Sequence, residues 1–285
     1  MFKGAAVGFV STFFTLPFQV ISTNMKVSGQ RQSKCSMIEM IHRIYNKEGM
    51  LGFYRGLIPN LLRIPIGNAF FFSTLEITQK YLHEKLHLNH TSCYLISSAL
   101  GMTIECLAVN PILLISTRNE TLGFNQYHSF IDALKQIRQK EGIKGFLSGL
   151  YPLIMKEVPS RSMFYLLYQF SYKQSLKLLY FKNTNINAFF SALFAGMVMS
   201  VIDNPLDLVR TRAQCKNIIV DGTIDDLSNR KQYFSLTNGL IDIYKHEGIK
   251  GFEKGVLPRL CRKIMSSTVT WTLYHALSSK TKRKK

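Results

Sequence analysis

Residues 205–210 read Pro-Leu-Asp-Leu-Val-Arg, with an acid and a base placed three residues apart directly after a proline. The same proline recurs at Pro17 and Pro111, so the three prolines follow one another at intervals of 94 residues. Each ends an apolar stretch and is followed by a Glu-Gly pair, at residues 48–49, 141–142 and 247–248. A fixed period of this length indicates one supersecondary unit that occurs three times.

The first two copies lack the charges of the third. Their corresponding segments read Pro-Phe-Gln-Val-Ile-Ser from Pro17 and Pro-Ile-Leu-Leu-Ile-Ser from Pro111. We place the three repeats at residues 1–90, 91–182 and 183–285, within one integral membrane domain.

Two stretches at equivalent repeat positions, residues 4–25 and 183–202, contain no ionised side chain. A helix rises ~1.5 Å per residue and needs about 20 residues to cross ~30 Å of hydrocarbon, so both can span a membrane. The first is too long for the apolar core of a signal peptide, and we expect no cleaved signal.

Four further candidate spans contain charged residues: 58–80, 92–117, 150–172 and 256–278. A charge at mid-bilayer costs at least ~2.5–3.5 kcal/mol, so these side chains must face water or one another if the segments span. Amphipathic helices of a soluble protein show a similar spacing of charges. The two uncharged stretches favour a membrane protein.

Basic residues gather in three loops, residues 26–55, 118–144 and 210–254, which hold 19 of the 36 Lys and Arg residues. We expect these loops to share the positively charged side of the membrane. A net charge of +19 spread over short loops does not form one binding face, so no nucleic-acid partner is expected. The sequence contains no metal-ligand spacing, phosphate-binding loop or catalytic triad, and we expect no metal, no cofactor and no enzyme.

Each repeat reads as a span, a proline, a basic loop, a short amphipathic helix, a Glu-Gly turn and a second span. The short helices are expected along the membrane surface at residues 35–47, 130–140 and 236–246. The glycine of each Glu-Gly pair should end the helix in left-handed geometry.

A proline inside a spanning helix removes one backbone hydrogen bond and bends the axis. Kinks at Pro17, Pro111 and Pro205 would draw the odd-numbered helices together at one end. The predicted fold is an all-α membrane protein with six transmembrane helices in three pseudo-symmetric repeats, each with a short amphipathic surface helix.

These features resemble the mitochondrial carrier family over essentially the whole chain. Its motif places an acid and two bases after each proline, then an acid-glycine pair and an aromatic-basic-glycine triplet. The third repeat matches through Asp207, Arg210, Arg212 and residues 252–255. The first keeps residues 53–56, and the second keeps Arg118 and Gly149. The resemblance implies the carrier fold, the mitochondrial inner membrane and solute transport by alternating access.

In that family the acid and base after each proline form an ionic ring that closes the matrix side. The resemblance assigns this matrix gate to Gln19, Ser22, Leu113, Ser116, Asp207 and Arg210. If each acid pairs with the base of the next helix, Asp207 and Arg210 both face uncharged partners, and no complete ion pair remains.

The family's outer gate corresponds to Glu76, Gln79, Gln169, Tyr172, His275 and Ser278. Hydrogen bonds worth about 1 kcal/mol each could still close it. The alternative is a helix end that no longer gates.

The family binds its solute about midway along the even-numbered helices. The matching residues are Arg63, Lys156, Glu157, Arg161, Arg262 and Lys263. Cations in a narrow funnel attract anions, and Arg suits carboxylate or phosphate, so the resemblance implies an anionic metabolite, with Glu157 recognising an amino group. The alternative is that these charges pair internally or hold lipid.

The resemblance also implies binding of cardiolipin near helix N-termini, at Tyr54, Arg55, Gly56, Tyr127 and Tyr233. Two functions stay open. One is transport of the anionic metabolite; the other is a carrier-fold accessory subunit of a larger mitochondrial membrane complex, such as a respiratory-chain complex, in which transport is lost.

Overall fold

The computed structural model describes residues 2–27, 36–86, 90–122, 127, 129–178, 184–215 and 236–282. Within these ranges the chain forms helices joined by turns, and no strand is present. The long helical elements are α1 (Phe2–Val27), α3 (Leu57–Leu86), α4 (His90–Glu120), α7 (Leu150–Leu178), α8 (Thr184–Ile202) continued by α9 (Asn204–Gln214), and α11 (Val256–Lys282). The short ones are α2 (Met37–Glu48), the 3-10 helix η2 (Met50–Tyr54), α5 (Phe130–Lys140), α6 (Gly142–Phe146) and α10 (Leu236–Gly251).

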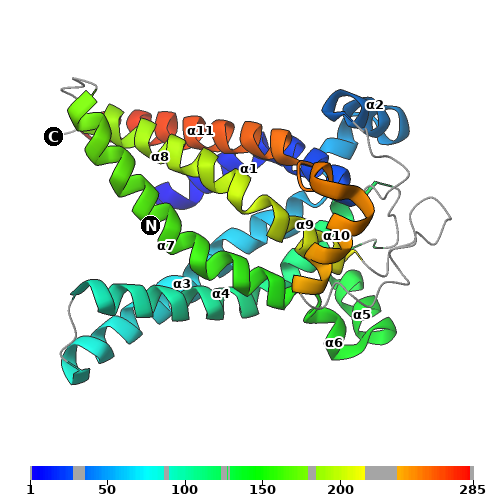
Figure 1. Ribbon diagram of the computed structural model, residues 1–285, viewed down its shortest axis with the longest axis horizontal. Coiled ribbons are helices and arrows are strands. Elements are labelled where there is room, and N and C mark those ends of the chain that lie inside the picture. The colour runs from blue at the N-terminus through cyan, green and yellow to red at the C-terminus, as the bar shows by residue number, and fades with distance from the viewer. Residues whose placement is uncertain are drawn as a thin grey trace.

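The long helices form a closed ring. Each contacts the next in chain order, with α8 and α9 acting as one bent rod, and α11 returns to contact α1. The short helices α2, α5, α6 and α10 gather at one end of the ring, called here the surface-helix end (Figure 1). Helix α1 begins and α11 ends at the opposite end, called the far end.

The three motif prolines differ in their local structure. Pro17 and Pro111 lie inside the continuous helices α1 and α4. Before Pro205 the helix breaks at Asp203, and α8 and α9 meet at 57°. The kink expected at the third proline is therefore present as a break between two helices.

The predicted short helices are confirmed as α2, α5 and α10. They pack on α1, α4 and α9, respectively, each within its own repeat. In the second repeat, Leu114 and Ile115 of α4 bury Ala133 and Ile137 of α5. The equivalent residues Leu208 and Val209 of α9 pack against Ile243, and Leu16 and Val20 of α1 lie in one cluster with Met40 and Ile44. As predicted, the regular helix is interrupted at the glycine of each Glu-Gly pair: Gly49 follows α2, Gly142 follows α5, and Gly248 lies at a kink within α10, with φ of 67°, 69° and 64°.

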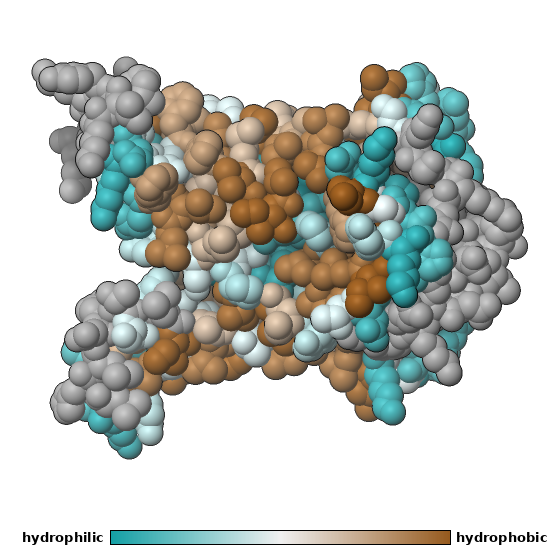
Figure 2. All heavy atoms as spheres, in the orientation of Figure 1, coloured by the Kyte–Doolittle hydropathy of each residue, from teal (hydrophilic) through white to brown (hydrophobic). Residues whose placement is uncertain are grey.

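Apolar side chains form a belt around the ring. Among the described residues, length and hydropathy alone identify α4 over Ser92–Glu120 as able to span a membrane, and the bent α8–α9 pair as a second candidate. Figure 2 shows hydrophobic residues across the waist and hydrophilic residues over the surface-helix end. Large aromatic side chains exposed on the long helices include Phe13, Phe14, Phe70, Phe72, Phe170, Phe190 and Phe194. Such a continuous apolar surface is typical of helices that face lipid.

Candidate functional site

The surface-helix end is closed by three hydrogen bonds that run in one direction around the ring. In each repeat, the residue seven positions after the proline donates from its side chain to the backbone of the next repeat. The acceptor is the carbonyl of the residue nine positions after that repeat's proline. The bonds are Asn24 Nδ2 to Glu120 O (2.8 Å), Arg118 Nε to Gln214 O (3.0 Å) and Arg212 Nε to Lys26 O (3.0 Å). Helices α1, α4 and α9 are therefore joined in a cycle.

The last residue of each aromatic-basic-glycine triplet packs against the next repeat. Gly255 has φ of +78°, and a Cβ atom there would lie 3.1 Å from the carbonyl oxygen of Ser22. Gly56 and Gly149 have the same geometry against the carbonyls of Ser116 and Arg210. The close approach of α3, α7 and α11 to the first long helix of the next repeat thus requires a residue without a side chain.

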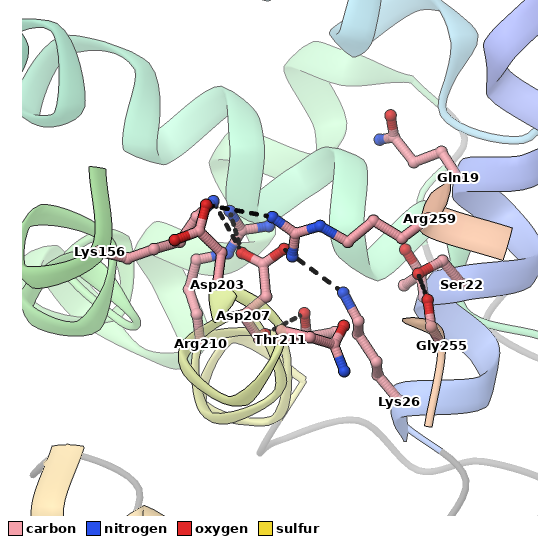
Figure 3. Close-up of polar contacts among 12 residues, drawn as sticks. Gln19, Ser22, Lys26, Lys156, Asp203, Asp207, Arg210, Thr211, Gly255 and Arg259 are labelled. Carbon is pink, nitrogen blue, oxygen red and sulfur yellow. Dashed lines mark hydrogen bonds and ion pairs between the residues drawn. The ribbon is translucent and has the colours of Figure 1, made fainter. Parts of the chain in front are cut away.

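Asp207 lies at the centre of a buried cluster of cations (Figure 3). Its side chain is 8% exposed; Oδ1 lies 2.9 Å from Lys156 Nζ and 3.6 Å from Arg210 Nη1. Its Oδ2 lies 3.4 Å from Lys26 Nζ and accepts a hydrogen bond from Arg259 Nη1. One carboxylate of the third repeat therefore joins α1, α7 and α11 to α9.

This cluster corrects the expectation that Asp207 faces uncharged partners. Its partners on other helices lie outside the six matrix-gate positions. Lys26 stands one helical turn after Ser22, whereas Lys156 belongs to α7 and Arg259 belongs to α11. A second acid, Asp203, accepts a hydrogen bond from Ser160 Oγ and lies 3.6 Å from Arg259 Nη2.

A separate buried carboxylate, Glu120 of α4, joins the first two repeats and is 2% exposed. Its Oε1 accepts hydrogen bonds from Gln19 Nε2 (2.6 Å), Asn60 Nδ2 (2.8 Å) and Ser116 Oγ (2.9 Å). Its Oε2 accepts one from Thr23 Oγ1 (2.7 Å). Glu120 therefore holds α1, α3 and α4 together through neutral donors.

The remaining matrix-gate positions make other contacts. Ser22 Oγ donates to Gly255 O (3.2 Å), and Leu113 packs in a cluster with Cys106, Val109 and Leu153. The sequence analysis missed Lys26, Glu120, Asp203 and Arg259. A signal existed for Lys26 and Glu120, since each lies four residues, or about one helical turn, after a gate serine.

Three of the predicted solute residues occupy equivalent places. Arg63, Lys156 and Arg262 each stand seven residues after the triplet glycine of their repeat. Lys156 is neutralised by Asp207 and by Glu157, whose Oε1 lies 2.7 Å from its Nζ. Arg262 Nη1 donates to Gln19 Oε1 (3.1 Å), and the buried Nε of Arg63 has no hydrogen-bond partner. Among the described residues, neither arginine makes an ion pair.

The other two predicted cations turn toward aromatic rings. Arg161 is exposed and lies over Phe71 of α3 at 5.7 Å, and Lys263 lies over Phe164 of α7 at 5.4 Å. The site is therefore asymmetric: one equivalent cation is neutralised, whereas those on α3 and α11 are not.

Comparison with known proteins identifies the fold. A family model described as mitochondrial carrier protein matches residues 1–86, 88–178 and 181–285. The chain belongs to the mitochondrial carrier family. It is 27% identical over 286 residues to Mitoferrin of Dictyostelium discoideum, covering 96% of this chain and 91% of that protein. It is 24% identical over 288 residues to the Mitochondrial glycine transporter of Homo sapiens, and 25% over 288 residues to that of Xenopus laevis; each match covers 97% of this chain and 88% of the relative.

Family membership confirms the six-helix, three-repeat fold, the mitochondrial inner membrane and solute transport rather than enzymatic catalysis. It favours transport over the accessory-subunit alternative.

At the far end the carrier shows no hydrogen bond between helices among the described outer-gate side chains. Gln169 Nε2 donates to Tyr165 of its own helix (3.0 Å), and Tyr172 packs on Tyr168. Glu76 and Gln79 line a pocket of about 290 Å³ with Lys80, His83 and Cys93, at the contact of α3 and α4. The side chains of His275 and Ser278 lie outside the described residues. Figure 2 shows the molecule hollowed at this end.

The predicted lipid-binding residues of the carrier have partners within the protein. Tyr54 stacks on Phe13 at 4.9 Å, Arg55 forms an ion pair with Glu48, and Tyr127 Oη accepts from Arg118 Nη1 (3.1 Å). Gly56 packs on Ser116 as described above, and Tyr233 lies outside the described residues. A role toward cardiolipin stays a prediction.

The acid of each Glu-Gly pair is also an ion-pair partner. Glu141 accepts two hydrogen bonds from Arg118 (2.6 and 2.9 Å). Glu247 lies 2.6 Å from Arg212 and 2.7 Å from Lys254. Burial alone would raise the pKa of the Glu247 carboxyl, but these two cations and their hydrogen bonds outweigh burial and hold that pKa below its ordinary value.

Proposed function

We propose that this carrier moves a small anionic metabolite by alternating access and that Arg63 and Arg262 bind its anionic group. The observation that carries this proposal is the pair of guanidinium groups at equivalent helix positions, neither of which has an ion-pair partner among the described residues. A guanidinium presents a planar fork of donors that matches a carboxylate or a phosphate. A bound anion would supply the charge that Asp207 supplies to Lys156.

The arrangement of the two ends supports entry from the far end. That end is hollowed, whereas hydrogen bonds and ion pairs join the helices at the surface-helix end. A solute that enters from the far end would meet Arg63 and Arg262 before it reaches the closed end. If the basic loops face the matrix, as their charge predicts, this state receives solute from the intermembrane side.

A second feature favours a solute that also carries an amino group. The sequence analysis assigned amino-group recognition to Glu157, but that carboxylate is already paired with Lys156. Glu105 of α4 is a better candidate, because its Oε1 lies against Gly67, one helical turn beyond Arg63 on α3. The two glycine transporters named above transport a solute that carries both a carboxylate and an amino group. We therefore propose small amino acids first among the candidate solutes that carry a carboxylate.

Uptake into liposomes tests the proposal. The purified carrier would first be screened for thermal stabilisation by carboxylates, amino acids and nucleotides, and then reconstituted with the compound that stabilises it. Arg63→Glu and Arg262→Glu should each abolish uptake, and the charge-conserving Arg63→Lys should retain part of it. Arg43→Glu, on the exposed face of α2, is the matched control. Unchanged uptake by both charge reversals would remove the site assignment.

The same preparation addresses the accessory-subunit alternative. We expect the isolated 32.6 kDa chain to transport without a partner. Stoichiometric retention in a large membrane complex, with no uptake by the isolated chain, would favour the alternative. Adding or omitting cardiolipin in the liposomes tests the predicted lipid requirement.

A further inference from the structure

Glu120 differs from Asp207 in the chemistry of its partners. Its carboxylate is 2% exposed, and its four hydrogen-bond donors, Gln19, Thr23, Asn60 and Ser116, are all neutral. Among the described residues no cation forms an ion pair with this carboxylate, so hydrogen bonds from neutral donors are what offset its burial. Glu120 interacts electrostatically with two cations of the solute site, Arg63 and Arg262.

A chain of hydrogen bonds connects Glu120 to that site. Arg262 Nη1 donates to Gln19 Oε1 (3.1 Å), and the amide nitrogen of the same Gln19 donates to Glu120 Oε1 (2.6 Å). Gln19 Nε2 also donates to Asn60 Oδ1 (3.1 Å) on α3. One amide of α1 thus connects a cation of α11 to the carboxylate of α4.

We propose that Glu120 is the gate carboxylate between the first two repeats, in place of the ring charges that these repeats lack, and that Gln19 couples it to the solute site. Glu120 stands one turn beyond the gate position Ser116, so it can hold α1, α3 and α4 without an acid at Gln19 or Leu113. An anion bound to Arg262 would compete with Gln19 for the guanidinium. Gln19 would then lose one of the contacts that orient it toward Glu120, and the closed end would loosen.

The chain contains a natural reporter for this end. Cys215, at the end of α9, is 4% exposed, and its Sγ lies 3.5 Å from Oγ1 of Thr121, the residue after Glu120. Burial raises the pKa of the Cys215 thiol to about 11, so it should react slowly while this end is closed. Separation of α4 from α9 would expose it.

The test is the rate at which N-ethylmaleimide labels Cys215 in a parent protein whose other four cysteines are alanine. Glu120→Gln removes the charge and keeps the shape, and labelling should become about tenfold faster, in line with the loss of hydrogen bonds to a charged group. Glu84→Gln, on the exposed part of α3, is the matched control and should label like the parent. Thermal unfolding of each variant ensures that labelling is compared well below its Tm. Equal rates in the parent and Glu120→Gln would overturn the assignment.

The coupling is tested by a double-mutant cycle. Arg262→Ala should change the labelling rate in the parent but not in the presence of Gln19→Ala, because the path from Arg262 to Glu120 is then already broken. Equal effects of Arg262→Ala with and without Gln19→Ala would contradict the coupling.

The inference rests on the proposed function only for the identity of the ligand that opens the gate. All labelling is done without solute, so a failure here leaves the uptake role of Arg63 and Arg262 standing. A failure of the uptake test in turn leaves the gate assignment standing.

Discussion

Asp207 is surrounded by more positive charge than it can neutralise. Lys26, Lys156, Arg210 and Arg259 all lie within 3.6 Å of its oxygens. Burying such charges costs free energy unless each has an oppositely charged partner. The main effect of the carboxylate is therefore to lower the free-energy cost of burying these cations. At the residue scale, the closed end therefore depends more on Asp207 than on any single cation.

The substitution Asp207→Asn should destabilise the carrier strongly. Removing one member of a buried ion pair costs roughly 3–5 kcal/mol, because its partners stay buried without compensation. Thermal unfolding in detergent should show a fall of several degrees in Tm. Asp203→Asn is the matched control, since the amide can still accept from Ser160 and the Arg259 contact there is longer, at 3.6 Å. Similar Tm values for the two variants would contradict the central role of Asp207.

At the scale of the elements, the second long helix of each repeat (α3, α7 or α11) begins directly after a glycine. This glycine lies against the first long helix of the next repeat. Gly255 and Gly248 belong to the same repeat and both have positive φ, of 78° and 64°. A Cβ at Gly255 would meet Ser22 O and Lys26 Cε at 3.1 Å, whereas nothing lies within 4 Å at Gly248. The two positions therefore separate backbone strain from helix packing.

Gly255→Ala should lower the Tm more than Gly248→Ala. Both substitutions place alanine in left-handed geometry, at a cost of about 1–2 kcal/mol. Only Gly255→Ala must also move α1 or Lys26, which adds roughly 1–3 kcal/mol. Equal shifts in Tm for the two variants would show that α11 does not pack on α1 as described.

The elements were predictable from the sequence because their signals are local. Pro205 marks the break between α8 and α9, and glycines with positive φ mark the turns after the short helices. The partners of Asp207 were not predictable in the same way, since Lys156 and Arg259 reach it from other helices. Lys26 and Glu120 lie one helical turn beyond the gate positions, and only the packing of neighbouring helices decides whether that turn faces the centre.

At the scale of the whole molecule, the acid of each Glu-Gly pair connects a surface helix to the ring or to the start of the next span. Glu48 pairs with Arg55, Glu141 with Arg118, and Glu247 with both Arg212 and Lys254. In the third repeat the lowered pKa of Glu247 ties this contact to pH. The unfolded chain takes up a proton near the ordinary value of 4.5, while the folded carboxyl stays ionised to lower pH.

The stabilisation from Glu247 should be complete above about pH 4.5 and lost as the pH falls through its lowered pKa. Glu247→Gln should therefore lower the Tm at pH 7, and the difference from the parent should shrink on acidification. Comparing the two proteins from pH 7 to about pH 3 cancels the titration of other carboxylates. A difference in Tm that stays constant over this range would contradict the prediction.

The cycle of three hydrogen bonds at the surface-helix end uses peptide oxygens as acceptors, so it places no demand on the side chains of the residues that supply them. Lysine, glutamate and glutamine occupy these equivalent sites in the three repeats, and the seal forms in each. The charge of the side chain at these three positions can therefore differ between repeats while the main-chain hydrogen bonds between the helices are kept. Because this closure uses main-chain acceptors, the charged side chains that hold the helices together can also lie one helical turn beyond the matrix-gate positions.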